Sequence, residues 1–293
     1  MKLEKKKFVL KYNKGIPQIL KKKLIADTET PFSSLLKISK NEKYSFLLES
    51  VEGGSKKGRY SLLGCDPDII WSVNNGKTSI KYLNYNYNYK LNTHPLESLR
   101  ELINISKFKD SDNDVPFPTL VGYLGYPMIR YMENINLQNK DNIKIPEATL
   151  IRPKVVAVFD NIKDIISLMT ISYPSKNVSA EKAFNDSSLL LKKTIKKLEK
   201  SILNSSKKYT KNKKLKFKSN FKKKDFFNLV SKAKKYIKEG DIFQVVTSQR
   251  FETKYSLQAI DLYRSLRRLN PSPYLVNLNL IMVVKSEIFQ YLL

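Results

Sequence analysis

The sequence is poor in the residues that disulfides and most metal sites need. Its 293 residues include one cysteine, Cys65, and one histidine, His94. A single cysteine excludes an internal disulfide and any site built from several thiolates. A single histidine excludes a histidine-rich metal centre and leaves little for a nucleophile that depends on a histidine base. Glycine loops that cradle phosphates, dinucleotide fingerprints and zinc-ligand spacings are also absent from the sequence.

Long apolar segments are lacking too. The longest nearly unbroken run, near Leu280 to Val284, is far shorter than the roughly 20 residues of a membrane helix. The first residues, Met1 to Lys7, are mostly charged, and no apolar signal core follows them. We therefore expect a cytoplasmic protein with neither a secretion signal nor a membrane partner.

Acidic residues are scarce beside basic ones. The chain has 54 Lys and Arg against 27 Asp and Glu, and the stretch from Lys192 to Lys224 contains a single acid, Glu199. Such a basic stretch can bind phosphate backbones, but no nucleic-acid-binding motif accompanies it. Asn and Ile are abundant and Gly is scarce, a bias that an AT-rich gene produces at surface positions. We therefore expect no nucleic-acid partner.

The remaining composition favours a packed α+β protein. With 41% hydrophobic residues, a chain of this length can bury a sizeable core. Several short β-rich runs separated by tight turns predict an antiparallel sheet in the first part of the chain. Asp66-Pro67 is expected to end the second of these runs, and Asn74-Asn75-Gly76 is expected to form a hairpin turn. The predicted strands are 44–48, 59–64, 154–159 and 164–170.

After residue 170 the pattern becomes helical. Ser179 can cap a first helix, a second should run over 225–239 and end at Gly240, and a third should cover 256–269. Residues 241–250 predict a buried strand between the last two helices. The apolar residues of the first helix form one stripe at helical spacing: Leu191, Ile195, Leu198 and Ile202. These patterns predict three parts: 8–170, a basic helix and linker over 171–218, and 219–293.

Three separated segments carry most of the information about function. They are FLLESVEGG (46–54) with GRYSLLG (58–64), GDIFQVV (240–246), and LYR through NPSPY (262–274). In residues, order and separation they resemble anthranilate synthase component I, a family of chorismate-utilising enzymes. The resemblance covers roughly residues 8–279. It implies an N-terminal effector domain over 8–170 and the first part of the chorismate-binding fold over 219–293.

The resemblance implies a reaction, a cofactor and a regulator. Members of this family aminate chorismate to anthranilate and release pyruvate, with Mg²⁺ as the cofactor. The ammonia comes from a glutamine amidotransferase partner, component II. L-Tryptophan inhibits the reaction by feedback. The sister enzyme that makes 4-amino-4-deoxychorismate shares this architecture and is kept as an alternative, as is a non-catalytic tryptophan-binding fragment.

The same resemblance places an L-tryptophan effector site on Ser50, Pro273, Tyr274 and Leu275, with Glu49 as a neighbour. A bound zwitterionic amino acid needs an acceptor for its ammonium, donors for its carboxylate and an apolar slot for its ring. Glu49 and Ser50 can supply an acceptor and a hydroxyl, while the Pro-Tyr loop is stiff and aromatic. In the alternative interpretation, Glu49 and Ser50 merely end a strand and Tyr274 packs in the core.

Gln244 is the candidate for a substrate pocket. On the predicted strand it would share a face with Ile242 and Val246, so its amide would need a hydrogen-bond partner. In related chorismate enzymes that add water, the matching residue is a lysine base. Ammonia needs no such base, so a neutral amide suits amination. The alternative is a buried glutamine that only ties strands together.

The chain departs from the family at its end. The family's Gly-Thr segment that grips a substrate carboxylate, its catalytic histidine and its magnesium-binding glutamates have no counterpart here, and from Ile281 onward the sequence no longer follows the family. We therefore expect a chain truncated at its C-terminus, with no catalytic residues, no metal ligands and no activity on its own.

Overall fold

The computed structural model describes residues 2–39, 43–50, 58–83, 91–108, 116–135, 145–202, 215–253, 258–284 and 287–292. The chain divides into two compact units. The first consists of Met1–Leu203 together with Ala259–Leu293, and the second is Asn204–Gln258. Each unit is described by itself below.

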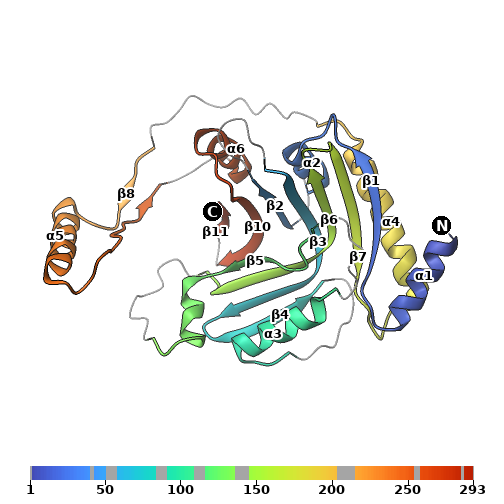
Figure 1. Cartoon of the computed structure of the whole chain (residues 1–293), viewed down its shortest axis with the longest axis horizontal. Coiled ribbons are helices and arrows are strands. Elements are labelled where there is room, and N and C mark those ends of the chain that lie inside the picture. The colour runs from blue at the N-terminus through green and yellow to red at the C-terminus, as the bar shows by residue number, and fades with distance from the viewer. Residues whose placement is uncertain are drawn as a thin grey trace. The chain divides into compact units, whose positions relative to one another are not determined.

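The first unit is built on one large sheet in which every strand pair of the described residues is antiparallel. Its main order is β1-β7-β6-β3-β2-β10-β11, with β4 added beside β3 and β5 beside β6 (Figure 1). The predicted α+β fold with an antiparallel sheet is therefore confirmed. The strands are β1 (Gln18–Ile25), β2 (Tyr44–Glu49), β3 (Tyr60–Asn74), β4 (Lys77–Tyr82), β5 (Val121–Leu124), β6 (Ala148–Asp160), β7 (Ile165–Ser172), β10 (Leu275–Val284) and β11 (Glu287–Leu292).

The two longest strands, β3 and β6, pair along almost their whole length and change their outer neighbours halfway. The first half of β3 pairs with β2 and its second half with β4, while β6 changes from β5 to β7. The change coincides with an irregular register at Pro67, which lacks the N–H that a regular ladder uses. The prediction that Asp66-Pro67 ends the strand is therefore wrong, because the proline bends β3 without stopping it.

A buried ion pair crosses this irregular point. Arg152 on β6 donates two hydrogen bonds to the Asp68 carboxylate on β3, at 2.8 and 2.7 Å, and both side chains are 1% exposed. The guanidinium carbon also lies 3.7 Å from the centre of the Tyr173 ring. The two parallel hydrogen bonds and the stacked Tyr173 ring compensate both charges for the water that they lose in the core.

Helices cover the sheet where apolar faces need partners. α4 packs on β7, and α1 and α2 pack against α4 (Figure 1). The predicted cap is confirmed, because the Ser179 hydroxyl accepts a hydrogen bond from the Lys182 backbone N–H. Leu191, Ile195 and Leu198 of the predicted stripe pack into the core. The helices of this unit are α1 (Lys2–Asn13), α2 (Pro31–Ile38), α3 (Pro95–Ser106), the 3₁₀ helix η1 (Tyr126–Tyr131), α4 (Ala180–Leu198) and α6 (Ala259–Leu269).

The hairpin turn predicted at Asn74-Asn75-Gly76 is confirmed. Asn75 and Gly76 join β3 to β4 with φ values of 49° and 76°, the left-handed conformation that a two-residue hairpin turn requires. On the same half of β3, Trp71 is fully buried and donates from its ring nitrogen to the Ser98 hydroxyl of α3 at 2.9 Å. This bond fixes α3 on the second half of β3.

The second unit contains α5 (Lys223–Glu239) and two short paired strands, β8 (Lys218–Ser219) and β9 (Phe251–Glu252). Gly240 ends α5 in the left-handed conformation, at φ 81°, as predicted. The prediction of a buried strand over 241–250 is wrong, because these residues form no strand and Phe243 is 94% exposed. A strand needs neighbours for its backbone N–H and C=O groups, and among the described residues of this unit only the short strands β8 and β9 pair, with each other.

The two units also follow different boundaries from the predicted parts 8–170, 171–218 and 219–293. The basic helix α4 packs on β7, and β10 pairs with β2, so both belong to the first unit. Composition changes along the chain mark the linker, but they cannot show that a later segment returns to the first sheet.

We predict that Asp68→Asn lowers the free energy of unfolding by about 3–5 kcal/mol, because it leaves the buried Arg152 charge without its partner. Urea unfolding followed by the fluorescence of Trp71, the one tryptophan, measures this loss. The control is Lys5→Gln, which breaks an exposed pair with Glu181 and should cost less than about 1 kcal/mol. Equal losses in the two variants would contradict the role given to the buried pair.

Candidate functional site

The predicted effector residues meet at one end of the β2–β10 pair. β2 and β10 are antiparallel, and their register places Glu49 directly opposite Leu275. Ser50 follows Glu49, and Tyr274 precedes Leu275, so both lie just beyond the last pair of the ladder. The structure therefore brings the Leu-Leu-Glu-Ser segment and the Pro-Tyr loop together, as expected.

The strand alternation separates the residues of the β2–β10 pair into two sets. Side chains on a strand point to alternate faces, and directly opposed residues share a face. Leu47 and Leu275 pack in one core cluster, whereas Leu48 and Val276 pack against another on the opposite face. Glu49 continues the Leu47 face.

Ser50 and Tyr274 lie just outside the two strands, where the alternation of strand side chains no longer applies. Tyr274 is 85% exposed, so the alternative in which it packs in the core is wrong. Its backbone N–H donates to the Ser272 hydroxyl at 3.2 Å, which helps to fix the loop. Ser50 lies against Gly58, where an added Cβ would sit only 2.1 Å from the Ser50 Cβ. Gly58 is therefore required by this close approach.

Glu49 points into the protein and is held by α6. The Tyr263 hydroxyl donates to Glu49 Oε2 at 2.6 Å, and Arg267 Nη2 forms an ion pair with Oε1 at 2.9 Å. Glu49 is 4% exposed and Tyr263 is fully buried. The Tyr263 ring stacks on Phe32 at 6.3 Å between centroids. Residues 214 positions apart thus share one buried hydrogen bond.

The electrostatics of this contact follow from its burial. Burial raises the pKa of Glu49 above its ordinary value, while the Tyr263 hydrogen bond and the Arg267 charge each lower it. Burial likewise raises the pKa of Tyr263, and the Glu49 carboxylate raises it further. Tyr263 therefore stays protonated and keeps donating to Glu49.

α6 forms where its sequence predicts and leads straight into the effector loop. Asn270 and Pro271 follow its last residue, Leu269, and three residues later the chain reaches Tyr274. Tyr263 and Arg267 are four residues apart, so they lie on the same face of the helix. Sequence reasoning quoted Tyr263 only as part of the family resemblance and did not predict its contact. The four-residue spacing was a signal for a shared face, but nothing in it identifies Glu49 as the partner.

The sequence also matches a known protein family. Residues 44–280 match the family described as chorismate binding enzyme. The chain belongs to the chorismate-binding enzymes. The resemblance noted in the sequence is therefore confirmed at the level of the family.

Among the relatives of this chain, anthranilate synthase component 1 of Cereibacter sphaeroides is 36% identical over 269 residues, covering 90% of this chain and 54% of that protein. The Aquifex aeolicus protein of the same name is 33% identical, covering 87% and 52%. The crystal structure of anthranilate synthase component I from Streptococcus pneumoniae has the same fold, with a TM-score of 0.57, 23% identity and coverage of 87% and 54%. The chain thus spans about half the length of the curated relatives it matches.

Gln244, the predicted substrate-pocket residue, lies in the second unit in an exposed segment without regular structure. The structure therefore provides none of the buried strand neighbours that the prediction assumed, and the pocket role stays a prediction.

Among the described residues, no group of three or more His, Cys, Asp or Glu is arranged to hold a metal ion. No helix among the described residues is both long enough and apolar enough to span a membrane.

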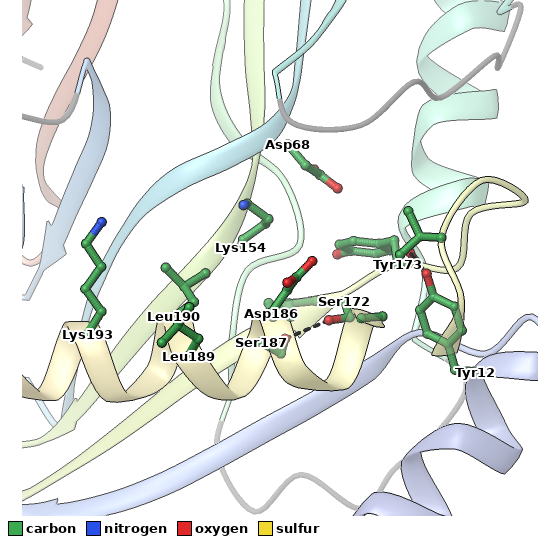
Figure 2. Close-up of a pocket in the computed structure, with 13 residues that line it drawn as sticks. Tyr12, Asp68, Lys154, Ser172, Tyr173, Asp186, Ser187, Leu189, Leu190 and Lys193 are labelled. Carbon is green, nitrogen blue, oxygen red and sulfur yellow. Dashed lines mark hydrogen bonds between the residues drawn. The ribbon is translucent and has the colours of Figure 1, made fainter. Parts of the chain in front are cut away.

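A separate cavity of about 240 Å³ lies between α4 and the sheet (Figure 2). Asp186 points into it from α4, and Asp68, Lys154 and Tyr173 line it from the side of the sheet. Ser172 and Ser187 close one wall with a hydrogen bond of 2.7 Å. The lining carries both signs of charge and includes none of the predicted effector residues.

We predict that Tyr263→Phe lowers the free energy of unfolding by about 1–3 kcal/mol, because Glu49 Oε2 loses its buried donor while the ring stack on Phe32 remains. Tyr274→Phe removes the same hydroxyl from an exposed ring and should change stability by less than about 0.5 kcal/mol. Urea unfolding of both variants measures the difference, and equal effects would contradict the contact.

A pH series on Glu49→Gln tests the raised pKa of Glu49. A carboxyl whose pKa is raised by folding stabilises the fold below its ordinary pKa, 4.5, and loses that contribution as pH rises through the raised value. The stability of the wild type relative to Glu49→Gln should therefore decrease as pH rises above 4.5 and then level off. Urea unfolding at closely spaced pH values measures this curve. A difference that increases with pH would show instead that folding lowers the pKa.

Proposed function

We propose that this chain is the effector-binding part of an anthranilate synthase component 1 and that it binds L-tryptophan at Ser50, Pro273, Tyr274 and Leu275. The observation that carries the proposal is the β2–β10 register, which places Glu49 opposite Leu275 and so brings the two segments of the site together. The relatives named anthranilate synthase component 1 support the choice of enzyme within the family.

The geometry of these residues suits an amino acid with an indole ring. The exposed ring of Tyr274 offers an aromatic surface, and Ser50 offers a hydroxyl at the same end of the β2–β10 pair. Leu275 is buried beneath the loop and fixes its position more than it offers a surface. The loop around Pro273 lies outside the ladder, so a backbone carbonyl there can accept from an ammonium, whereas the Tyr274 N–H already donates to the Ser272 hydroxyl.

The proposed activity of the whole enzyme is the amination of chorismate to anthranilate with release of pyruvate. Ammonia would come from the glutamine amidotransferase, component II, and L-tryptophan would inhibit by feedback. We propose that the 293 residues alone do not catalyse this reaction, because they offer no group suited to Mg²⁺ in the described part and no counterpart of the family's catalytic histidine.

The first experiment titrates the full chain with L-tryptophan by calorimetry. We expect 1:1 binding, and a Kd at least about tenfold weaker for Ser50→Phe and for Tyr274→Ala, a loss of roughly 1.4 kcal/mol each. The matched control is Tyr126→Ala, which removes another exposed tyrosine, 72% exposed, that also neighbours a proline. Unchanged binding by both site variants would contradict the site.

The cavity under α4 provides the competing location. Asp186→Asn changes its lining without touching β2 or β10. If this variant lost L-tryptophan while Ser50→Phe and Tyr274→Ala kept it, the ligand would belong to the cavity. Absence of binding by the wild type would refute the proposed function altogether.

The second experiment assays the full chain with chorismate, excess ammonia and Mg²⁺. We expect no anthranilate fluorescence above the enzyme-free control. An intact anthranilate synthase component 1 from a relative serves as the positive control. Steady production of anthranilate by the 293-residue chain would contradict the proposal that it is inactive alone.

A further inference from the structure

Glu49 lies in the middle of the predicted effector residues, yet its carboxylate is already engaged elsewhere. Oε2 accepts from Tyr263 at 2.6 Å, and Oε1 is paired with the Arg267 guanidinium at 2.9 Å. The Glu49 side chain is 2% exposed. A carboxylate held this way from two sides has little access to a ligand arriving from solvent.

The strand geometry points Glu49 away from the proposed ligand. Glu49 lies on the same face of the sheet as Leu275, which packs in the cluster that contains Tyr263. Ser50 and Tyr274 lie just beyond the last pair of the ladder, and Tyr274 is 85% exposed. An ammonium bound beside the exposed Tyr274 ring would therefore lie on the solvent side of the loop, whereas the Glu49 carboxylate points into the core toward α6.

We infer that Glu49 is a positioning residue that fastens the end of β2 to α6, and that it does not bind the ammonium of the effector. This inference deepens the proposed function and rests on it. The same helix that holds Glu49 leads through Asn270 and Pro271 into the Tyr274 loop. One contact thus sets the relative position of Ser50, at the end of β2, and Tyr274, just beyond α6.

A second arginine on the same helix provides a control for the contact of Arg267 with Glu49. Arg264 and Arg267 lie three residues apart on α6. Arg267 contacts the Glu49 carboxylate, whereas the Arg264 guanidinium lies over the Phe32 ring at 5.3 Å. Replacing either arginine removes one positive charge from α6, but only the change at Arg267 removes a contact with Glu49.

The test compares two ligands on the full chain by calorimetry. L-Tryptophan carries the ammonium, and indole-3-propionate keeps the ring and the carboxylate but lacks it. We expect Glu49→Gln to weaken both ligands by the same factor, on the order of tenfold, and Tyr263→Phe to do likewise. The double variant should be little weaker than the more affected single variant, because both changes break one connection.

The result that would overturn the inference is a selective one. If Glu49→Gln weakened L-tryptophan and left indole-3-propionate unchanged, Glu49 would bind the ammonium directly, and the proposed function would still stand. If the wild type bound no L-tryptophan, the proposed function would fail and the inference with it. The two failures are therefore distinguishable in one set of titrations.

The two arginines give a second test that needs L-tryptophan alone. We expect Arg267→Gln to weaken its binding about tenfold and Arg264→Gln to change it less than about twofold. Thermal unfolding of both variants checks that each is folded at the titration temperature. Equal effects of the two substitutions on affinity would overturn the inference, even where Glu49→Gln does not fold.

Discussion

The antiparallel pairing of β2 with β10 is the constraint on which the candidate site depends. It joins a strand near the start of the chain to one near its end, and it is closed by a buried carboxylate that α6 holds through Tyr263 and Arg267. Pairing across such a separation costs more loop-closure entropy than a hairpin does, so apolar burial and specific polar contacts have to offset that cost. The apolar pairs along β2 and β10 provide the burial, and the contacts of Glu49 with α6 are the specific polar contacts.

A second constraint shapes the sheet on which this pair lies. The strands β3 and β6 each change partners at a proline, Pro67 and Pro153, which lie opposite one another. The ion pair of Asp68 and Arg152 lies beside this point. A regular ladder here would align β2 and β4 as one continuous edge of the sheet. The irregularity instead divides the edge, so that β2 is left to pair with β10 while β4 packs near α3.

Sequence reasoning succeeded where the deciding interaction is local. The turn at Asn75 and Gly76, the cap at Ser179 and the helix end at Gly240 each depend on a few neighbouring residues, so a single sequence is sufficient to predict them. It failed over 241–250, because an apolar run with strand propensity forms a strand only where other strands accept it. The predicted parts 8–170, 171–218 and 219–293 differ from the two compact units, since the return of β10 to β2 leaves no trace in local composition.

The resemblance to a known family predicted which segments meet, but not what each residue of a segment does. In the run Leu47-Leu48-Glu49, alternate side chains face opposite sides of the sheet, so two neighbours in one motif have different surroundings. Ser50 lies against Gly58, while Glu49 is buried against α6. Under the proposed function, one motif would contain a residue that contacts the ligand, Ser50, and a neighbour that places it, Glu49, and the motif alone does not tell the two roles apart. The structure adds the contacts of Glu49 with Tyr263 and Arg267 on α6, a helix more than 200 positions away in the sequence, which the motif does not reveal.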